Sequence, residues 1–145
     1  MRVNFTDVES TTFEAIPKGT YKAKITDGEI RESGPNAKNP GAQYINWEFT
    51  IQEGEYTSRK QWLNTSLLPQ ALFSLKGLLE ATGRFTQDQL DGDLDFEIED
   101  VLGSDVVIVV NTREYEGEMR NDVKRVKPAG AAAEGPVAAG ASLLP

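Results

Sequence analysis

Two tryptophans stand in neighbouring strand-like runs of this sequence, and their alternation patterns assign them to opposite faces. Between residues 43 and 52, Trp47 alternates in phase with apolar residues, so its side chain is expected in the core. Between about residues 57 and 67, Trp62 alternates out of phase with Leu63 and Thr65, so its side chain is expected on the surface. An exposed indole beside a lysine is a poor core residue, but it can stack on a nucleic-acid base of any type.

Cations and further aromatic residues are expected on the same surface as Trp62 or in the loops that flank it. They are Lys22, Lys24, Lys38, Tyr44, Arg59, Lys60, Arg113, Tyr115 and Arg120. Lysine and arginine would contact phosphates without reading sequence, whereas the aromatic rings would stack on bases. Single strands fit this set better than a duplex, because no segment resembles a helix that enters the major groove.

Each of these residues also has a purely structural explanation. Trp62 could be half-buried beneath the N-terminal segment or the helix, and Tyr44 could be a simple cross-strand partner. Lys22 and Lys24 could solvate the outer face of an edge strand. Arg59 shares the alternation of the core-facing residues, or else it lies at a bulge. The functional interpretation depends on all of these residues sharing one surface.

The composition removes most kinds of catalytic site. The chain has no cysteine and no histidine, which excludes disulfides, thiolate zinc sites and the usual proton shuttle at neutral pH. The acidic run that starts at Asp91 fails the calcium-loop spacing, because Phe96 and Leu102 stand where glycine and glutamate are required. We therefore expect no enzyme, no cofactor and no metal, and a solvated acidic loop.

The net charge of −8 is concentrated in one segment of the chain. Residues 86 to 105 contain eight acidic residues and no Lys or Arg, so the rest of the chain has 15 basic residues against 23 − 8 = 15 acidic ones. Charges more than about 8–10 Å apart are largely screened at physiological salt, so the body of the protein can still present a basic groove.

The order of predicted elements is three strands, one helix and two strands. Strands are expected at about residues 19–31, 43–52, 57–67, 105–115 and 119–127, with a helix between Pro69 and Gly83 whose leucine stripe is expected in the core. This is the element order of an OB-fold, so we predict an all-β domain with one helix, a five-stranded OB-fold-like barrel. The predicted boundaries are an irregular lead-in at 1–17, the barrel at 18–128 and a flexible Ala/Gly/Pro-rich tail at 129–145.

Several short motifs also resemble a known family. They are Ile16-Pro17-Lys18-Gly19-Thr20-Tyr21, Glu48-Phe49-Thr50-Ile51, Trp62-Leu63-Asn64 and Arg120-Asn121-Asp122-Val123-Lys124. From about residue 5 to residue 128 the chain resembles a bacteriophage family described only as a domain of unknown function. Its members are similar to phage single-stranded-DNA-binding proteins, and their genes lie near recombination and replication genes. The chain departs from that family at Thr57-Ser58, where the pattern has a glycine before the arginine.

The resemblance implies a non-enzymatic protein that coats single-stranded DNA during phage replication or recombination. Phage recombinase or replication proteins would be its partners, and an edge strand could pair with a second copy to give a homo-oligomer. No stretch approaches the roughly 20 apolar residues of a membrane helix, so we expect no membrane partner and a location in the cytoplasm of the infected bacterial host. The alternative is a protein-interaction module, such as a recombinase accessory or virion component, that does not bind nucleic acid.

Overall fold

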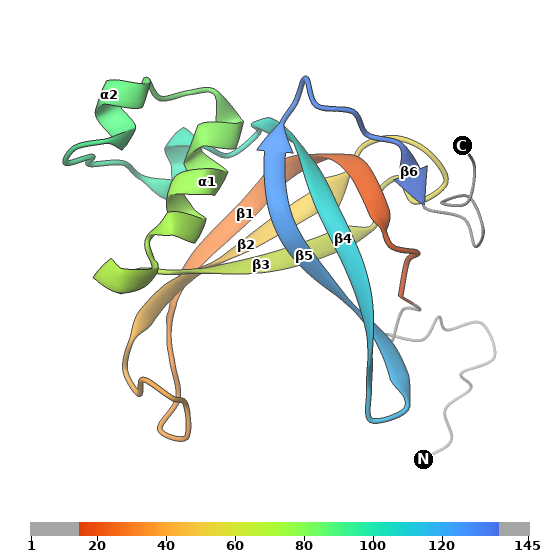
Figure 1. Cartoon of the computed structure of the whole chain (residues 1–145), viewed down its shortest axis with the longest axis horizontal. Coiled ribbons are helices and arrows are strands. Elements are labelled where there is room, and N and C mark those ends of the chain that lie inside the picture. The colour runs from red at the N-terminus through yellow and green to blue at the C-terminus, as the bar shows by residue number, and fades with distance from the viewer. Residues whose placement is uncertain (1–14, 137–145) are drawn as a thin grey trace, which may run out of the picture.

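The computed structural model describes residues 15–136, which form one antiparallel sheet with a helical insertion (Figure 1). The strands are β1 (Gly19–Glu32), β2 (Gln43–Ile51), β3 (Lys60–Ser66), β4 (Asp105–Tyr115), β5 (Glu118–Pro128) and β6 (Gly135–Pro136). Between β3 and β4 lie η1 (Pro69–Ala71), α1 (Phe73–Thr82), α2 (Gln87–Leu90) and η2 (Ile98–Asp100). The predicted order of three strands, one main helix and two strands is therefore confirmed.

The strands are hydrogen-bonded in the order β3-β2-β1-β4-β5, which makes the described part of the chain one open sheet. β1 is central because its first half pairs with β4 and its second half pairs with β2. β3 and β5, at the two ends of this order, approach each other, and α1 packs against both. The sheet is thus strongly curved around a single core.

The core confirms the face assignment made from alternation in the second strand. Ile45, Trp47, Phe49 and Ile51 are all buried, and Trp47 has no exposed surface. The Trp47 indole Nε1 donates a hydrogen bond of 2.8 Å to Thr65 Oγ1, so the only polar atom of this buried ring has a partner.

A β-bulge in β1 changes which residues of that strand face the core. Ile25 pairs with Phe49 and Asp27 pairs with Glu48, so one extra residue, Thr26, lies between two consecutive pairs. After this bulge Gly28 comes opposite Trp47. The bulge explains why the alternation of this strand becomes irregular in the sequence.

Both ends of the described chain are attached to the sheet. Ile16 is buried, and its backbone N–H and C=O are both hydrogen-bonded to the Asn121 side chain. At the other end, β6 pairs with Gly19 and Thr20 of β1. Residues 135 and 136, which the sequence analysis assigned to a flexible tail from residue 129 onward, are thus paired with the sheet. The remainder of the predicted tail, 137–145, and most of the predicted lead-in, 1–14, lie outside the described residues.

The predicted leucine stripe of the helix is only partly in the core. Leu75, Leu78 and Leu79 are buried, as expected, but Leu72 is 41% exposed and Phe73 is 74% exposed. These two residues lie at the start of α1, where Leu72 is the N-cap and Phe73 is the first residue of the helix. Within residues 15–136, no helix has the length and apolar character needed to cross a membrane.

Candidate nucleic-acid interface

The outer face of β1, β2 and β3 carries several of the predicted site residues in adjacent rows. Lys60 on β3 lies opposite Thr50 on β2, which in turn lies opposite Lys24 on β1. In the next row Trp62 lies opposite Glu48. Trp62 is 53% exposed, so its predicted position on the surface is confirmed.

Two further rows continue along the same face with polar residues. Asn64 lies opposite Asn46, and the Asn46 side-chain amide donates a 2.7 Å hydrogen bond to Asn64 Oδ1. Beyond them, Tyr44 lies between Arg31 on β1 and Ser66 on β3. We call the surface formed by Lys24, Arg31, Tyr44, Asn46, Glu48, Lys60, Trp62, Asn64 and Ser66 the outer face.

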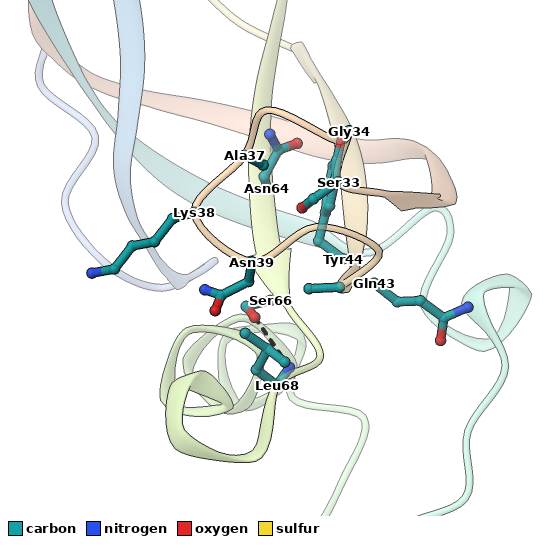
Figure 2. A pocket seen from close by; sticks show the side chains of 11 residues that line it. Ser33, Gly34, Ala37, Lys38, Asn39, Gln43, Tyr44, Asn64, Ser66 and Leu68 are labelled. Atoms are coloured by element: carbon teal, nitrogen blue, oxygen red, sulfur yellow. Dashed lines mark hydrogen bonds between the residues drawn. The ribbon is translucent and has the colours of Figure 1, made fainter.

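One end of the outer face is covered by the loop that joins β1 to β2 (Figure 2). A hollow of about 470 Å³ lies between this loop and the strands, and Tyr44, Asn64 and Ser66 are among its lining residues. Lys38 belongs to the loop, and in Figure 2 its side chain extends outward from the hollow. The structure therefore brings Lys38 close to Tyr44, two residues that the sequence predicted for the same site.

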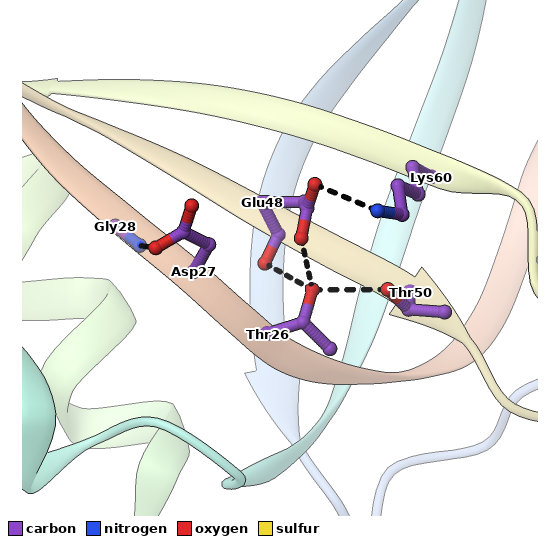
Figure 3. Close-up of polar contacts among 6 residues, drawn as sticks. All are labelled: Thr26, Asp27, Gly28, Glu48, Thr50 and Lys60. Atoms are coloured by element: carbon purple, nitrogen blue, oxygen red, sulfur yellow. Dashed lines mark hydrogen bonds and ion pairs between the residues drawn. The ribbon is translucent and has the colours of Figure 1, made fainter.

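Near the other end of the outer face, Lys60, which was predicted to contact phosphate, forms an ion pair with Glu48 (Figure 3). Glu48 Oε1 lies 3.2 Å from Lys60 Nζ, and Glu48 Oε2 accepts a 2.6 Å hydrogen bond from Thr26 Oγ1. The Thr26 hydroxyl also lies 2.9 Å from the hydroxyl of Thr50. Lys60 is thus part of a polar network, and a DNA phosphate would have to compete with Glu48 for it.

The two predicted lysines of β1 also have acidic neighbours. Lys22 Nζ lies 3.4 Å from Glu53, and Lys24 Nζ lies 3.7 Å from Asp105. All four side chains are well exposed. Exposed ion pairs of this kind contribute only about 0–1 kcal/mol, so exchanging a carboxylate for a phosphate would cost little.

The remaining predicted residues lie outside the outer face. Arg113 and Arg120 are cross-strand neighbours in the β4–β5 hairpin, where Arg113 pairs with Asp122 at 2.6 Å and Arg120 pairs with Glu118 at 3.6 Å. Tyr115 is the last residue of β4, at the turn of this hairpin. Arg59 is half-buried and lies immediately before β3. The residue before it, Ser58, has a φ of 75°, so the backbone is irregular where the alternation of Arg59 was ambiguous.

Sequence reasoning did not single out Arg31, Asn46 and Asn64 as site residues. The two asparagines share the alternation of Trp62 and Tyr44, so their parity alone could have indicated them. Arg31 could not be placed from alternation, because the bulge at Thr26 changes the parity of the strand before Arg31 is reached. A hydrogen bond and the charge of the adjacent Glu29 raise the pKa of the Arg31 guanidinium, which stays a cation at any physiological pH.

The acidic segment does not form a metal centre among the described residues. Across residues 15–136, no three acidic side chains converge in a way that could hold a metal ion. The chemistry available on the outer face is therefore stacking, hydrogen bonding from amides and hydroxyls, and charge contacts from lysine and arginine.

Comparison with known proteins places the chain in a family without assigning an activity. The family model described as "Protein of unknown function (DUF669)" matches residues 2–136. The chain belongs to this family. No curated protein matches the sequence. The family match covers all six strands and the helices between them, so the outer face lies wholly within the region that the family model matches.

Proposed function

We propose that this protein binds single-stranded DNA without sequence preference, through the outer face of β2 and β3. The observation that carries the proposal is Trp62, whose ring is half-exposed in the middle of a strand. The exposed half of this ring gains nothing from burial, but it offers a stacking platform worth about 1–3 kcal/mol per base. Tyr44, further along the same face, supplies a second ring.

The rows of the outer face define the direction in which a bound DNA strand would run and the length of DNA that the face could hold. Lys24 and Lys60 lie at one end, whereas Arg31 and the loop residue Lys38 lie at the other. From Lys60 to Ser66 a strand rises about 20 Å, which is long enough for several nucleotides. Asn46 and Asn64 lie between the two ends and can donate hydrogen bonds to bases or to the sugar-phosphate backbone.

We further propose that the curved sheet is an OB-fold-like barrel. In an OB-fold the ligand lies on strands two and three, between the loop that joins strands one and two and the loop that joins strands four and five. In Figure 1 the β1–β2 loop and the β4–β5 hairpin project to the same side, with β3 passing above and between them. Arg113, Tyr115 and Arg120 on the hairpin would then extend the binding surface beyond the outer face.

The biological role that we propose follows from the family resemblance in the sequence. The protein would coat single-stranded DNA during bacteriophage replication or recombination, in the cytoplasm of an infected bacterial host. It would perform no catalytic step, and phage recombinase or replication proteins would act on the coated strand. Pairing of sheet edges between copies would give a homo-oligomer along the DNA.

A second candidate is a protein-interaction module that does not bind nucleic acid. The observation that favours it is the pairing of Lys22, Lys24 and Lys60 with carboxylates, which leaves less uncompensated positive charge on the sheet. The net charge of −8 favours it as well. The two candidates differ in whether the outer face takes up a polyanion.

A fluorescence titration with oligothymidine separates the two candidates. Trp47 is fully buried and Trp62 is exposed, so a ligand that quenches tryptophan emission on this protein reports mainly on Trp62. DNA binding predicts quenching at low salt that weakens steeply as salt is added, and weaker binding of a duplex of equal length. No change in emission or in oligonucleotide anisotropy at any salt concentration would favour the interaction module.

A further inference from the structure

An apolar groove lies on the helical side of the molecule, apart from the outer face. Its volume is about 210 Å³, and it runs between α1 and the segment that follows α2. Leu72, Phe73, Leu75 and Leu79 line it from the α1 side, whereas Leu90 and Leu94 line it from the other. Phe73 is 74% exposed, more than any other large apolar side chain of the described residues. Leu75 and Leu79 are thus core residues at the base of the groove, whereas Leu72 and Phe73 are exposed apolar side chains.

Acidic residues surround the groove-lining Leu90 and Leu94 in the sequence. Asp88, Asp91, Asp93 and Asp95 are all exposed, and they flank Leu90 and Leu94 in the sequence. Asp91 pairs with Lys76 at 2.8 Å, and Lys76 is the one cation among the lining residues. Asp88, Asp93 and Asp95 make no ion pair with any residue between 15 and 136, so their charges are uncompensated there. Three uncompensated carboxylates of the acidic segment therefore lie within two residues of the leucines that line an apolar opening.

We propose that this groove binds a basic amphipathic segment of a partner protein. An apolar side chain of the segment would cover Phe73 and Leu72, and flanking Lys or Arg residues would pair with Asp93 and Asp95. Amphipathic helices bind in this way, with apolar anchors in a groove and charges at the rim. The charge argues against other occupants, because phosphates would be repelled and a second copy would bring the same acidic residues.

The inference is independent of DNA binding, because it uses other residues and another side of the sheet. A probe can therefore be chosen without nucleic acid: a synthetic amphipathic helix of leucine and lysine, labelled for fluorescence anisotropy. One control peptide has the same leucines with glutamate in place of lysine. A second has the same composition in an order that gives no apolar face.

Variants of the full chain test which residues the probe contacts. Phe73→Ser is expected to weaken binding by about tenfold, because an exposed anchor at the centre of a contact dominates its affinity. Asp93→Asn with Asp95→Asn is expected to weaken it severalfold and to reduce its salt dependence. The matched controls are Met119→Ser, which removes a side chain that is 55% exposed on the β4–β5 hairpin, and Glu32→Gln with Glu114→Gln. Both controls should leave the affinity unchanged.

The proposal is overturned if the control variants weaken binding as much as the groove variants, because the attraction would then be general. It is also overturned if the glutamate peptide or the reordered peptide binds as tightly as the probe. A concentration-dependent dimer that Phe73→Ser abolishes would assign the groove to a second copy. A gain in peptide affinity on removal of residues 137–145 would assign it to the end of this chain. Circular dichroism and Trp47 emission establish that each variant is folded.

Discussion

At the scale of single residues, the two tryptophans show how strand alternation separates stability from binding. Trp47 is enclosed by the core and hydrogen-bonded to Thr65, whereas Trp62 is half-exposed and lies beside a charged residue. Alternation in the sequence predicted both positions correctly, because each tryptophan lies in a strand without a bulge between it and its apolar neighbours.

Replacing each tryptophan by alanine should therefore affect folding very differently. Trp47→Ala should lower the free energy of unfolding by about 3–5 kcal/mol, because it empties a core site and leaves the Thr65 hydroxyl without its partner. Trp62→Ala should change that free energy by no more than about 0.5 kcal/mol. Urea unfolding followed by circular dichroism measures both values. Exchanged phenotypes would show that the face assignment is wrong.

Ser58 occupies a backbone position that favours glycine. Its φ is 75°, in the left-handed region that glycine adopts without steric cost. Ser58→Gly should raise the free energy of unfolding by about 0.5–1 kcal/mol, since relief of the backbone strain exceeds the added entropy of the unfolded chain. Thr57→Gly, next in sequence and without a positive φ, is the control and should destabilise the protein. If both substitutions changed the free energy of unfolding equally, the positive φ of Ser58 would not be the cause of the effect.

At the scale of elements, the bulge in β1 decides which side chains reach the core and the outer face. Gly28 comes under Trp47 after the bulge, and a Cβ built there would lie 2.8 Å from Ile98 Cγ2 and 3.0 Å from Trp47 Cε3. β1 can therefore pass beneath the indole only with glycine at this position.

Gly28→Ala should accordingly destabilise the protein by about 1–3 kcal/mol, because the added methyl group would lie too close to both Ile98 and Trp47. The control is Gly34→Ala in the β1–β2 loop, where a Cβ meets nothing within 4 Å and which should change stability by at most about 0.5 kcal/mol. Thermal unfolding of both variants and of the wild-type protein measures these changes in stability. A neutral Gly28→Ala would mean that Trp47 moves freely, against its complete burial.

The elements also show what sequence patterns could and could not predict. Strand and helix positions followed from alternation and from the signals at Pro69 and Gly83, and these agree with the structure. The pairing of β6 with β1 could not be predicted, because two residues in an Ala/Gly-rich segment carry no alternation. The carboxylate partners of Lys24 and Lys60 come from other strands, so only the register of the sheet reveals them.

At the scale of the whole molecule, the acidic excess lies mainly in one segment, whereas the outer face carries charges of both signs. On the outer face, Arg31 pairs with Glu29 and Lys60 pairs with Glu48, and Lys38 adds a cation on the loop. Of the acidic residues between 86 and 105, all of which the structure describes, Asp105 alone pairs with a cation of this face, Lys24. Screening over about 8–10 Å limits how far the acidic segment can influence a bound strand. The local charge of the outer face, rather than the net charge, should therefore control affinity for DNA.

Two sets of substitutions that remove negative charge test whether local charge or net charge controls affinity for DNA. Glu48→Gln should strengthen oligothymidine binding and steepen its salt dependence by about one unit of slope, because Lys60 becomes available to a phosphate. Asp93→Asn with Asp95→Asn removes more negative charge but should leave affinity and slope nearly unchanged, since these residues lie at the groove and not on the outer face. Anisotropy titrations over a range of salt concentrations measure both. If the double variant strengthened binding more than Glu48→Gln, net charge would be the controlling quantity.

The central claim is that Trp62 stacks on a base of single-stranded DNA. Its most direct test is the dissociation constant of oligothymidine for the wild-type protein and for Trp62→Ala, measured by anisotropy of the labelled oligonucleotide at one fixed salt concentration. We expect affinity to fall by about 1–3 kcal/mol, or about 5–150-fold, while the circular dichroism spectrum is unchanged. Equal dissociation constants for the two proteins would contradict the claim, and so would an absence of binding by the folded wild-type protein.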